Sequence, residues 1–168
     1  MTARALTLGL VFVGCLLPSG ASGQVGELLG IKKCGNWSRL IPHLRDIVPN
    51  QRQEALSAVE VMIKAAYAQG FLMGQLAGRP EREFQAGTPA IQAWVGGLIK
   101  MDRSQLTEAL DSLCADPRNE DLDVALVGML AITAAGGLNA ARIEDAYTQL
   151  RTTGGDPHTR AIEALNRQ

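Results

Sequence analysis

A histidine and an aspartate are spaced so that they could act together as a general base. His43 and Asp46 lie three positions apart, which on a helix places the carboxylate beside the imidazole that it would orient. No local motif such as Gly-x-Ser-x-Gly adds a nucleophile to this pair. The sequence also lacks a zinc motif such as His-Glu-x-x-His, a phosphate loop and a dinucleotide fingerprint. We therefore predict no catalytic residues, no metal and no cofactor, with a small enzyme using His43 as the weaker alternative.

The three cysteines offer a different chemistry. If Cys15 is removed with a targeting segment, Cys34 and Cys114 remain, and two thiols in an exported chain indicate one disulfide. Such a bridge closes a long loop and would stabilise the fold by up to about 4.5 kcal/mol in the chain-entropy model. Redox catalysis is the alternative, but a catalytic pair usually has the spacing Cys-x-x-Cys.

The first 23 residues have the features of a signal peptide. Arg4 supplies the positive charge, an apolar run covers residues 5–17, and small residues precede a cleavage site before Gln24. The apolar run is too short for the roughly 20 residues that cross a bilayer, so we expect no stable membrane span. This predicts a periplasmic or secreted protein. The alternative is a lipoprotein anchored through Cys15, because residues 12–15 resemble a lipobox.

Composition is that of a globular protein with balanced charge. The chain of 168 residues has 16 basic and 17 acidic residues, a hydrophobic content of 46% and a mean hydropathy of +0.04. Proteins that bind nucleic acid or a membrane surface usually carry a basic patch, so we expect neither partner.

Helix signals recur along the chain, whereas strand signals are scarce. We expect a short helix or irregular arm over 34–49, and a buried central helix over 122–135, where a long uncharged run occurs. The other helices and their expected caps are 51–77 (Asn50), 89–99 (Thr88), 105–115 (Asp102 or Ser104), 140–150 (Asn139) and a last one from 156. The prediction is an all-α bundle of about five to six helices with one disulfide. We divide it into a signal peptide (1–23), a disulfide-braced domain (24–135) and a C-terminal helical extension (136–168).

The long helix carries small residues at every fourth position. Ala66, Gly70, Gly74 and Gly78 share one face, and glycine inside a helix costs roughly 1 kcal/mol relative to alanine. Close approach of another backbone would compensate this cost, either within the chain or from a partner helix.

Aromatic and charged residues flank this small-residue stripe. Tyr67, Phe71 and Met73 are expected either at the margin of the core or as an exposed surface for an apolar partner. The charged loop over 79–84 follows the helix. The predicted partner-binding residues are Tyr67, Gly70, Phe71, Gly74, Glu81, Arg82 and Glu83.

Three segments together resemble known exported proteins. They are Cys34-Gly35-Asn36-Trp37, the helical stretch over 66–74 and the stretch over 110–117, which ends in Cys114-Ala115-Asp116-Pro117. Over about residues 34–130 this order resembles the Rap1a/Tai immunity proteins and the HdeA-like acid-stress chaperones. Residues 138–168 have no counterpart in them. The resemblance implies a disulfide joining two helices and no catalytic residues.

The sequence therefore predicts an exported, non-catalytic, protein-binding helical protein of the bacterial cell envelope, immunity- or adaptor-like. Its partner would be an effector, an envelope component or unfolded clients. The alternative is a periplasmic acid chaperone, which needs many carboxylates that lose their charge together. Seventeen acidic residues give that mechanism no special support. The oligomeric state stays open.

Overall fold

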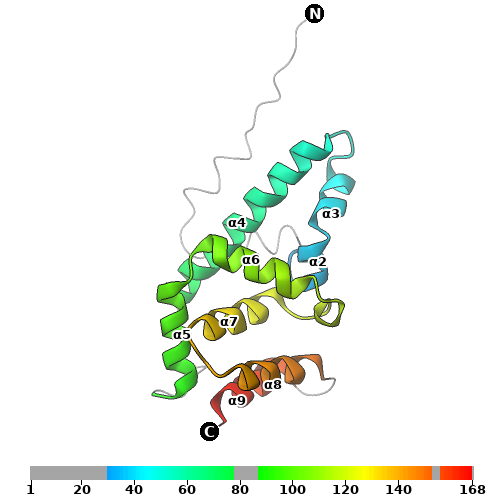
Figure 1. Cartoon of the computed structure of the whole chain (residues 1–168). Helices are drawn as coiled ribbons and strands as arrows, with labels where there is room; N and C mark the ends of the chain where they lie inside the picture. The colour runs from blue at the N-terminus through cyan, green and yellow to red at the C-terminus, as the bar shows by residue number, and fades with distance from the viewer. Residues whose placement is uncertain (1–29, 78–86, 153–155, 168) are drawn as a thin grey trace, which may run out of the picture.

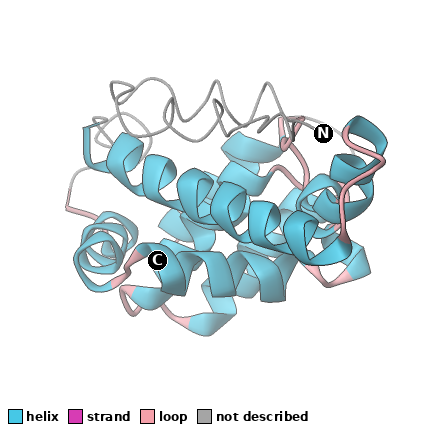
Figure 2. Cartoon of the chain, turned by 90° about the horizontal axis from the view of Figure 1, so that it is seen from above, coloured by secondary structure: helices cyan, strands magenta, loops and turns pink. Residues whose placement is uncertain are grey.

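The computed structural model describes residues 30–77, 87–152 and 156–167, and within these ranges the chain is helical with no strand. Figure 2 shows that the helices are joined mostly by short loops. The all-α prediction is therefore confirmed. The predicted signal peptide, Cys15, Gly78 and the loop residues Glu81, Arg82 and Glu83 lie outside the described residues. The helices are α2 (Cys34–Ser38), α3 (Leu40–Ile47), α4 (Gln53–Ala77), α5 (Pro89–Lys100), α6 (Arg103–Cys114), the 3-10 turn η2 (Pro117–Asn119), α7 (Val124–Ala135), α8 (Ala140–Arg151) and α9 (Pro157–Asn166).

Side-chain caps set most of the helix starts. Thr88 accepts a hydrogen bond from the backbone of Ile91, and Asn139 accepts one from Ala141, as predicted. Asp102 and Gln105 form a reciprocal capping box at the start of α6. The predicted cap at Asn50 is wrong. The backbone N–H of Gln51 donates to Val48, which places Asn50 in a turn, and α4 begins at Gln53.

The predicted central helix is α7, and it lies in the middle of the core. Val124, Val127, Leu130 and Ile132 are completely buried. Helices α5 and α6 pack on α7, and α4 packs on α6 (Figure 1). This arrangement follows from the uncharged sequence of α7, because a helix that is apolar all round is stable when neighbours cover every side.

The predicted disulfide is present and joins two helices. Cys34 at the start of α2 bonds Cys114 at the end of α6, across 80 residues of sequence, with 4.7 Å between their Cα atoms. Backbone hydrogen bonds support it, since Cys34 donates to Leu122 and Val124 donates to Lys32. Both sulfur-bearing residues are buried. The bridge therefore ties the first described helix to the middle of the chain.

The C-terminal helices dock on the same core. Ala146 and Leu150 of α8 are buried, as are Ala161 and Leu165 of α9, and all four belong to the cluster that contains α7. Polar contacts add to this packing. The Thr88 hydroxyl lies 3.0 Å from the Asn166 amide oxygen. Residues 140–152 and 156–167 thus pack on the disulfide-braced helices.

Candidate protein-binding site

The predicted aromatic residues Tyr67 and Phe71 lie at the margin of the core. Both are half-buried, and their rings are stacked with centroids 6.3 Å apart. Tyr67 also meets the completely buried Trp37 edge to face at 5.4 Å. Phe71 contacts α7 at Gly128, where an added Cβ would lie 3.1 Å from the ring. These side chains therefore connect α4 to the core.

The small-residue stripe does not mark a close helix crossing at Gly74. A Cβ added there would meet no atom of the described residues within 4 Å, and Gly70 and Gly74 are half-buried. The close crossing lies between α5 and α7 instead. A Cβ at Gly97 would be 2.7 Å from the carbonyl carbon of Ile132, and one at Gly136 would be 2.8 Å from the backbone nitrogen of Gly97.

A shallow apolar groove lies beside the C-terminal part of α4. Four α4 residues at helical spacing line it on one side, and the corner between α5 and α6 lines the other. Its volume is about 450 Å³. We call it the α4/α5 groove, and its lining residues are Gln69, Leu72, Met73, Leu76, Leu98, Met101, Asp102, Arg103 and Ser104. The Asp102 capping box fixes the corner, so it holds the shape of the groove.

Large apolar side chains are exposed in and beside this groove. Met73 and Leu76 on α4 are 48% and 59% exposed. Val95 and Ile99 share one side of α5 with the groove residue Leu98, and Ile99 is 79% exposed. Their burial by a partner would be favourable, because apolar surface removed from water contributes roughly 25 cal/mol per Å².

Beyond its first turn, α4 has few charged residues. Between Ala55 and Ala77 the sequence has two charged residues, Glu60 and Lys64. They form an ion pair of 3.0 Å, and the Lys64 ammonium also donates to Asp111 at 2.7 Å. Burial lowers the pKa of Lys64, but the hydrogen bonds to Asp111 and Glu60 outweigh it, so the pKa lies above its ordinary value.

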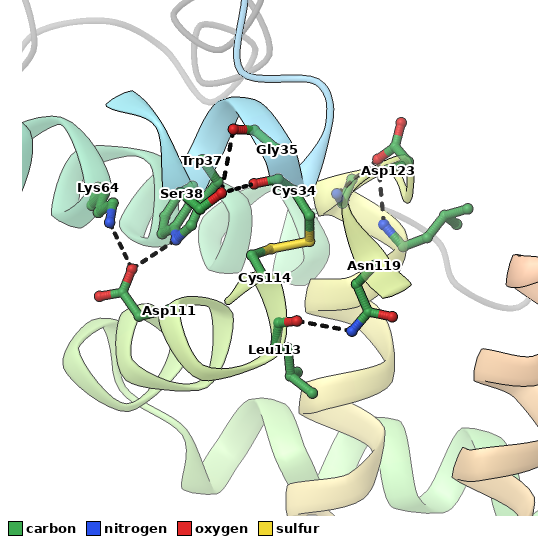
Figure 3. Close-up of a disulfide and its surroundings, with 12 residues drawn as sticks. Cys34, Gly35, Trp37, Ser38, Lys64, Asp111, Leu113, Cys114, Asn119 and Asp123 are labelled. Carbon is green, nitrogen blue, oxygen red and sulfur yellow. Dashed lines mark hydrogen bonds and ion pairs between the residues drawn. A yellow bond between two sulfur atoms is a disulfide. The ribbon is translucent and has the colours of Figure 1, made fainter. Parts of the chain in front are cut away.

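Figure 3 shows the ion pair of Lys64 with Asp111 near the disulfide. The indole N–H of Trp37 donates to the same Asp111 oxygen at 2.8 Å. The Lys64 ammonium lies 5.3 Å from the centroid of the Trp37 ring. Asp111 thus fixes both α2 and α4 on α6, and the charges of Glu60 and Lys64 are paired within the molecule.

A second cleft is polar and contains the predicted base. His43 and Asp46 line it, with a volume of about 280 Å³, between α2, α3 and the loop after η2. Arg39 pairs with Glu120, and Lys33 pairs with Asp121 at 2.9 Å. Within the described ranges no hydrogen bond joins His43 to Asp46, and no serine or cysteine lines the cleft. This arrangement has no nucleophile for the base to activate.

The described part of the chain has neither a metal-binding cluster nor a membrane-spanning helix. No three histidine, cysteine, aspartate or glutamate side chains there are grouped to hold a metal ion. Among the same residues no helix has both the length and the apolar character to cross a membrane.

Comparison with known proteins identifies no relative: no family model, no curated protein and no solved structure matches the chain. The resemblance to the Rap1a/Tai and HdeA-like proteins therefore stays a prediction. The candidate site depends on the geometry described above.

Sequence reasoning named Met73 but missed most of the groove. Leu76 and Leu98 fall within predicted helices to which no binding role was assigned, and Met101 falls between the helices predicted over 89–99 and 105–115. A signal was present in α4, because several large apolar residues are exposed on it and the sequence between Ala55 and Ala77 has two charged residues, Glu60 and Lys64. A helix that is apolar on its solvent side as well as its core side indicates an interaction surface.

The two tyrosines of the chain should titrate abnormally. Burial and the charge of Asp123 raise the pKa of Tyr67 to about 12, and burial also raises the pKa of Tyr147. A folded-state pKa above the unfolded value contributes stability that is complete below pH 10 and lost as the pH rises to about 12. For Tyr67 this amounts to about 2–3 kcal/mol.

We expect no tyrosinate absorbance at 295 nm near pH 10 and a steep rise at higher pH, together with loss of the helical circular dichroism signal. The same protein in urea serves as the control and should titrate near pH 10. A simple titration near pH 10 with unchanged helicity would show that the tyrosines are accessible.

Proposed function

We propose that this is an exported, non-catalytic protein of the bacterial cell envelope that binds another protein, in the manner of an immunity protein or adaptor. The observation that carries the proposal is the α4/α5 groove with its exposed apolar side chains Met73 and Leu76, together with the exposed Ile99 next to the groove residue Leu98. In the free chain these side chains remain exposed to water. A partner that covers them would bury their apolar surface.

The shape of the groove favours a helix as the bound element. An amphipathic helix places apolar side chains at every third and fourth position, and a groove between two helices accepts such a row. The groove lining also includes one positive and one negative side chain, Arg103 and Asp102. We therefore expect a partner with an exposed amphipathic helix that has polar or charged residues at its edges.

Export is supported by the buried disulfide. Disulfides form and persist mainly in oxidising compartments, such as the bacterial periplasm. Cys34 and Cys114 are almost inaccessible to solvent, so the bridge serves as a structural brace. This supports a periplasmic or secreted location, with lipid attachment at Cys15 as the alternative.

The alternatives have less support. An acid chaperone would need carboxylates that lose their charge around its apolar surface, and the groove lining has one, the helix cap Asp102. An enzyme would need a nucleophile or bound group near His43, and the described lining of its cleft offers no nucleophile.

The proposal predicts one partner whose capture depends on the groove. The tagged protein would be purified from its native envelope without reductant, and bound proteins would be quantified by mass spectrometry. We expect one protein in equimolar amount, and Ile99→Asp should reduce its capture about tenfold or more, because a charge would enter an apolar interface.

Ala141→Glu is the matched control, since it adds the same charge at an exposed position of α8 and should leave capture unchanged. Many weakly held proteins enriched at low pH would favour the chaperone. No bound protein, or a partner equally retained by Ile99→Asp, would contradict the proposal. Loss of the biological effect in a folded His43→Ala variant would favour the enzyme.

A further inference from the structure

Two methionine thioethers line the α4/α5 groove from different elements. Met73 lies on α4, and Met101 lies between α5 and α6. Met73 is 48% exposed, so a small oxidant dissolved in water can reach its sulfur. Met101 is half-buried and packs against the core, so its sulfur should react more slowly. The groove therefore contains one readily accessible site of sulfur chemistry.

Other oxidation-sensitive side chains of the described residues are covered or already oxidised. Cys34 and Cys114 are joined in the buried disulfide, so neither has the thiolate that an oxidant attacks first. The indoles of Trp37 and Trp94 are buried. Within the described ranges, oxidation by a dissolved peroxide should therefore begin at the methionines.

The methionines differ in exposure and in position. Met62 and Met73 are 50% and 48% exposed, and both lie on α4. About 16 Å along the helix separates them, and Met62 is outside the groove lining. Met129 is 4% exposed in the core. An oxidant should thus modify the two α4 methionines at similar rates and spare Met129, so the fold persists while the groove changes.

Oxidation would make the apolar groove polar. The sulfur lone pair of the thioether attacks one oxygen of hydrogen peroxide, the O–O bond breaks, an S–O bond forms, and the second oxygen leaves as water after proton transfer. The product, methionine sulfoxide, is polar and chiral. Its oxygen is hydrated in the free chain. An apolar side chain of a bound helix would displace that water and offer no hydrogen bond, which is costly.

We propose that Met73 is a reversible oxidation site whose sulfoxide switches off binding at the α4/α5 groove. The proposal rests on the proposed function, because it takes the groove as the partner-binding surface. The oxidant is a peroxide outside the cytosol, in the oxidising compartment that the disulfide supports. Methionine sulfoxide reductases reverse the step, since two thiols become a disulfide and the oxygen leaves as water.

The site is tested first on the purified, disulfide-intact protein. It would be exposed to hydrogen peroxide for increasing times, freed of peroxide and mapped by peptide mass spectrometry. Met62 and Met73 should be oxidised at similar rates and Met129 at least about tenfold more slowly, because its sulfur is reached only when the core opens. Circular dichroism should stay unchanged. Oxidation of Met73 as slow as that of Met129, or loss of helicity together with Met73 oxidation, would overturn the proposal.

The switch is tested by repeating the envelope capture with the oxidised protein. Capture of the partner should fall about tenfold or more, and treatment with the reductases for both sulfoxide epimers should restore it. Met73→Leu keeps an apolar side chain of similar size without sulfur, so it should retain capture after the same exposure. Met62→Leu is the matched control and should lose capture as the unmodified protein does.

The outcomes separate the switch from the function on which it rests. Full capture by the oxidised protein, or equal loss in Met73→Leu and the unmodified protein, would overturn the switch alone. Protection by Met62→Leu would overturn it as well, because the sensitive sulfur would then lie outside the groove. No capture before any oxidation would contradict the proposed function, and the switch with it.

Discussion

Gly97→Ala is expected to remove more than about 4 kcal/mol from the free energy of unfolding, which is most of the stability of a domain of this size. The added Cβ would lie 2.7 Å from the carbonyl carbon of Ile132 and closer still to its oxygen. Both atoms belong to the backbone of α7, so no side chain can rotate away. Urea denaturation followed by circular dichroism measures the loss directly.

The neighbouring glycine is the matched control. A Cβ at Gly96 would lie 3.6 Å from the carbonyl oxygen of Gly136, which is an ordinary contact. Gly96→Ala should therefore be neutral or stabilise α5 by up to about 1 kcal/mol, since alanine is the better helix former. Equal effects of the two substitutions would show that α5 and α7 do not cross at Gly97.

Trp37→Ala is expected to cost about 3–5 kcal/mol, because the indole is completely buried. It would also remove the hydrogen bond to Asp111 and the ring that lies beside Lys64. Denaturation should be measured without reductant, so that the Cys34–Cys114 bridge stays intact and the loss comes from the Trp37 side chain rather than from the disulfide.

Trp37→Phe separates the two contributions. It keeps an aromatic ring and loses the indole N–H, so part of the packing remains while Asp111 loses one donor. The expected cost is about 1–2 kcal/mol. If Trp37→Ala were as mild as Trp37→Phe, the indole would not fill the space between α2 and α6 in solution.

Much of the fold was predictable from local chemistry. Thr88, Asp102 and Asn139 cap helices as expected, because a short polar side chain can accept a hydrogen bond from the next turn. The uncharged run before Gly136 forms the central helix α7, because burying its apolar residues away from water is favourable. Asn50 failed as a cap because the turn beginning at Val48 extends the chain before α4 starts.

The site was less predictable, because it depends on which helices meet. The α4/α5 groove combines Leu76 with Met101, and no periodic pattern within one helix indicates their approach. The glycines of the close helix crossing were difficult to predict for the same reason. Spacing drew attention to Gly70 and Gly74, whereas the close crossing uses Gly97 and Gly136, which belong to different helices.

His43 and Asp46 illustrate the limit of sequence spacing for chemistry. Three positions along α3 bring both residues to one cleft, as expected. The ion pairs of Arg39 with Glu120 and of Lys33 with Asp121 also line it. These partners come from the loop around residues 120–121. The sequence of α3 alone does not predict that this loop lies beside it.

The five methionines of the chain allow the most direct test of binding through the groove. Besides Met1 they are Met62, Met73, Met101 and Met129. With ¹³C-labelled methionine methyl groups, each assigned by substitution with leucine, the protein would be mixed with a solubilised extract of its native envelope. Methyl NMR spectra would be recorded before and after mixing.

Met73 and Met101 line the α4/α5 groove, whereas Met129 is buried in the core. If the groove binds a partner, the Met73 and Met101 signals shift or broaden, the Met129 signal stays in place, and Ile99→Asp suppresses the change. A spectrum in which Met73 and Met101 stay unchanged in the extract, while the protein still captures its partner, would contradict the account.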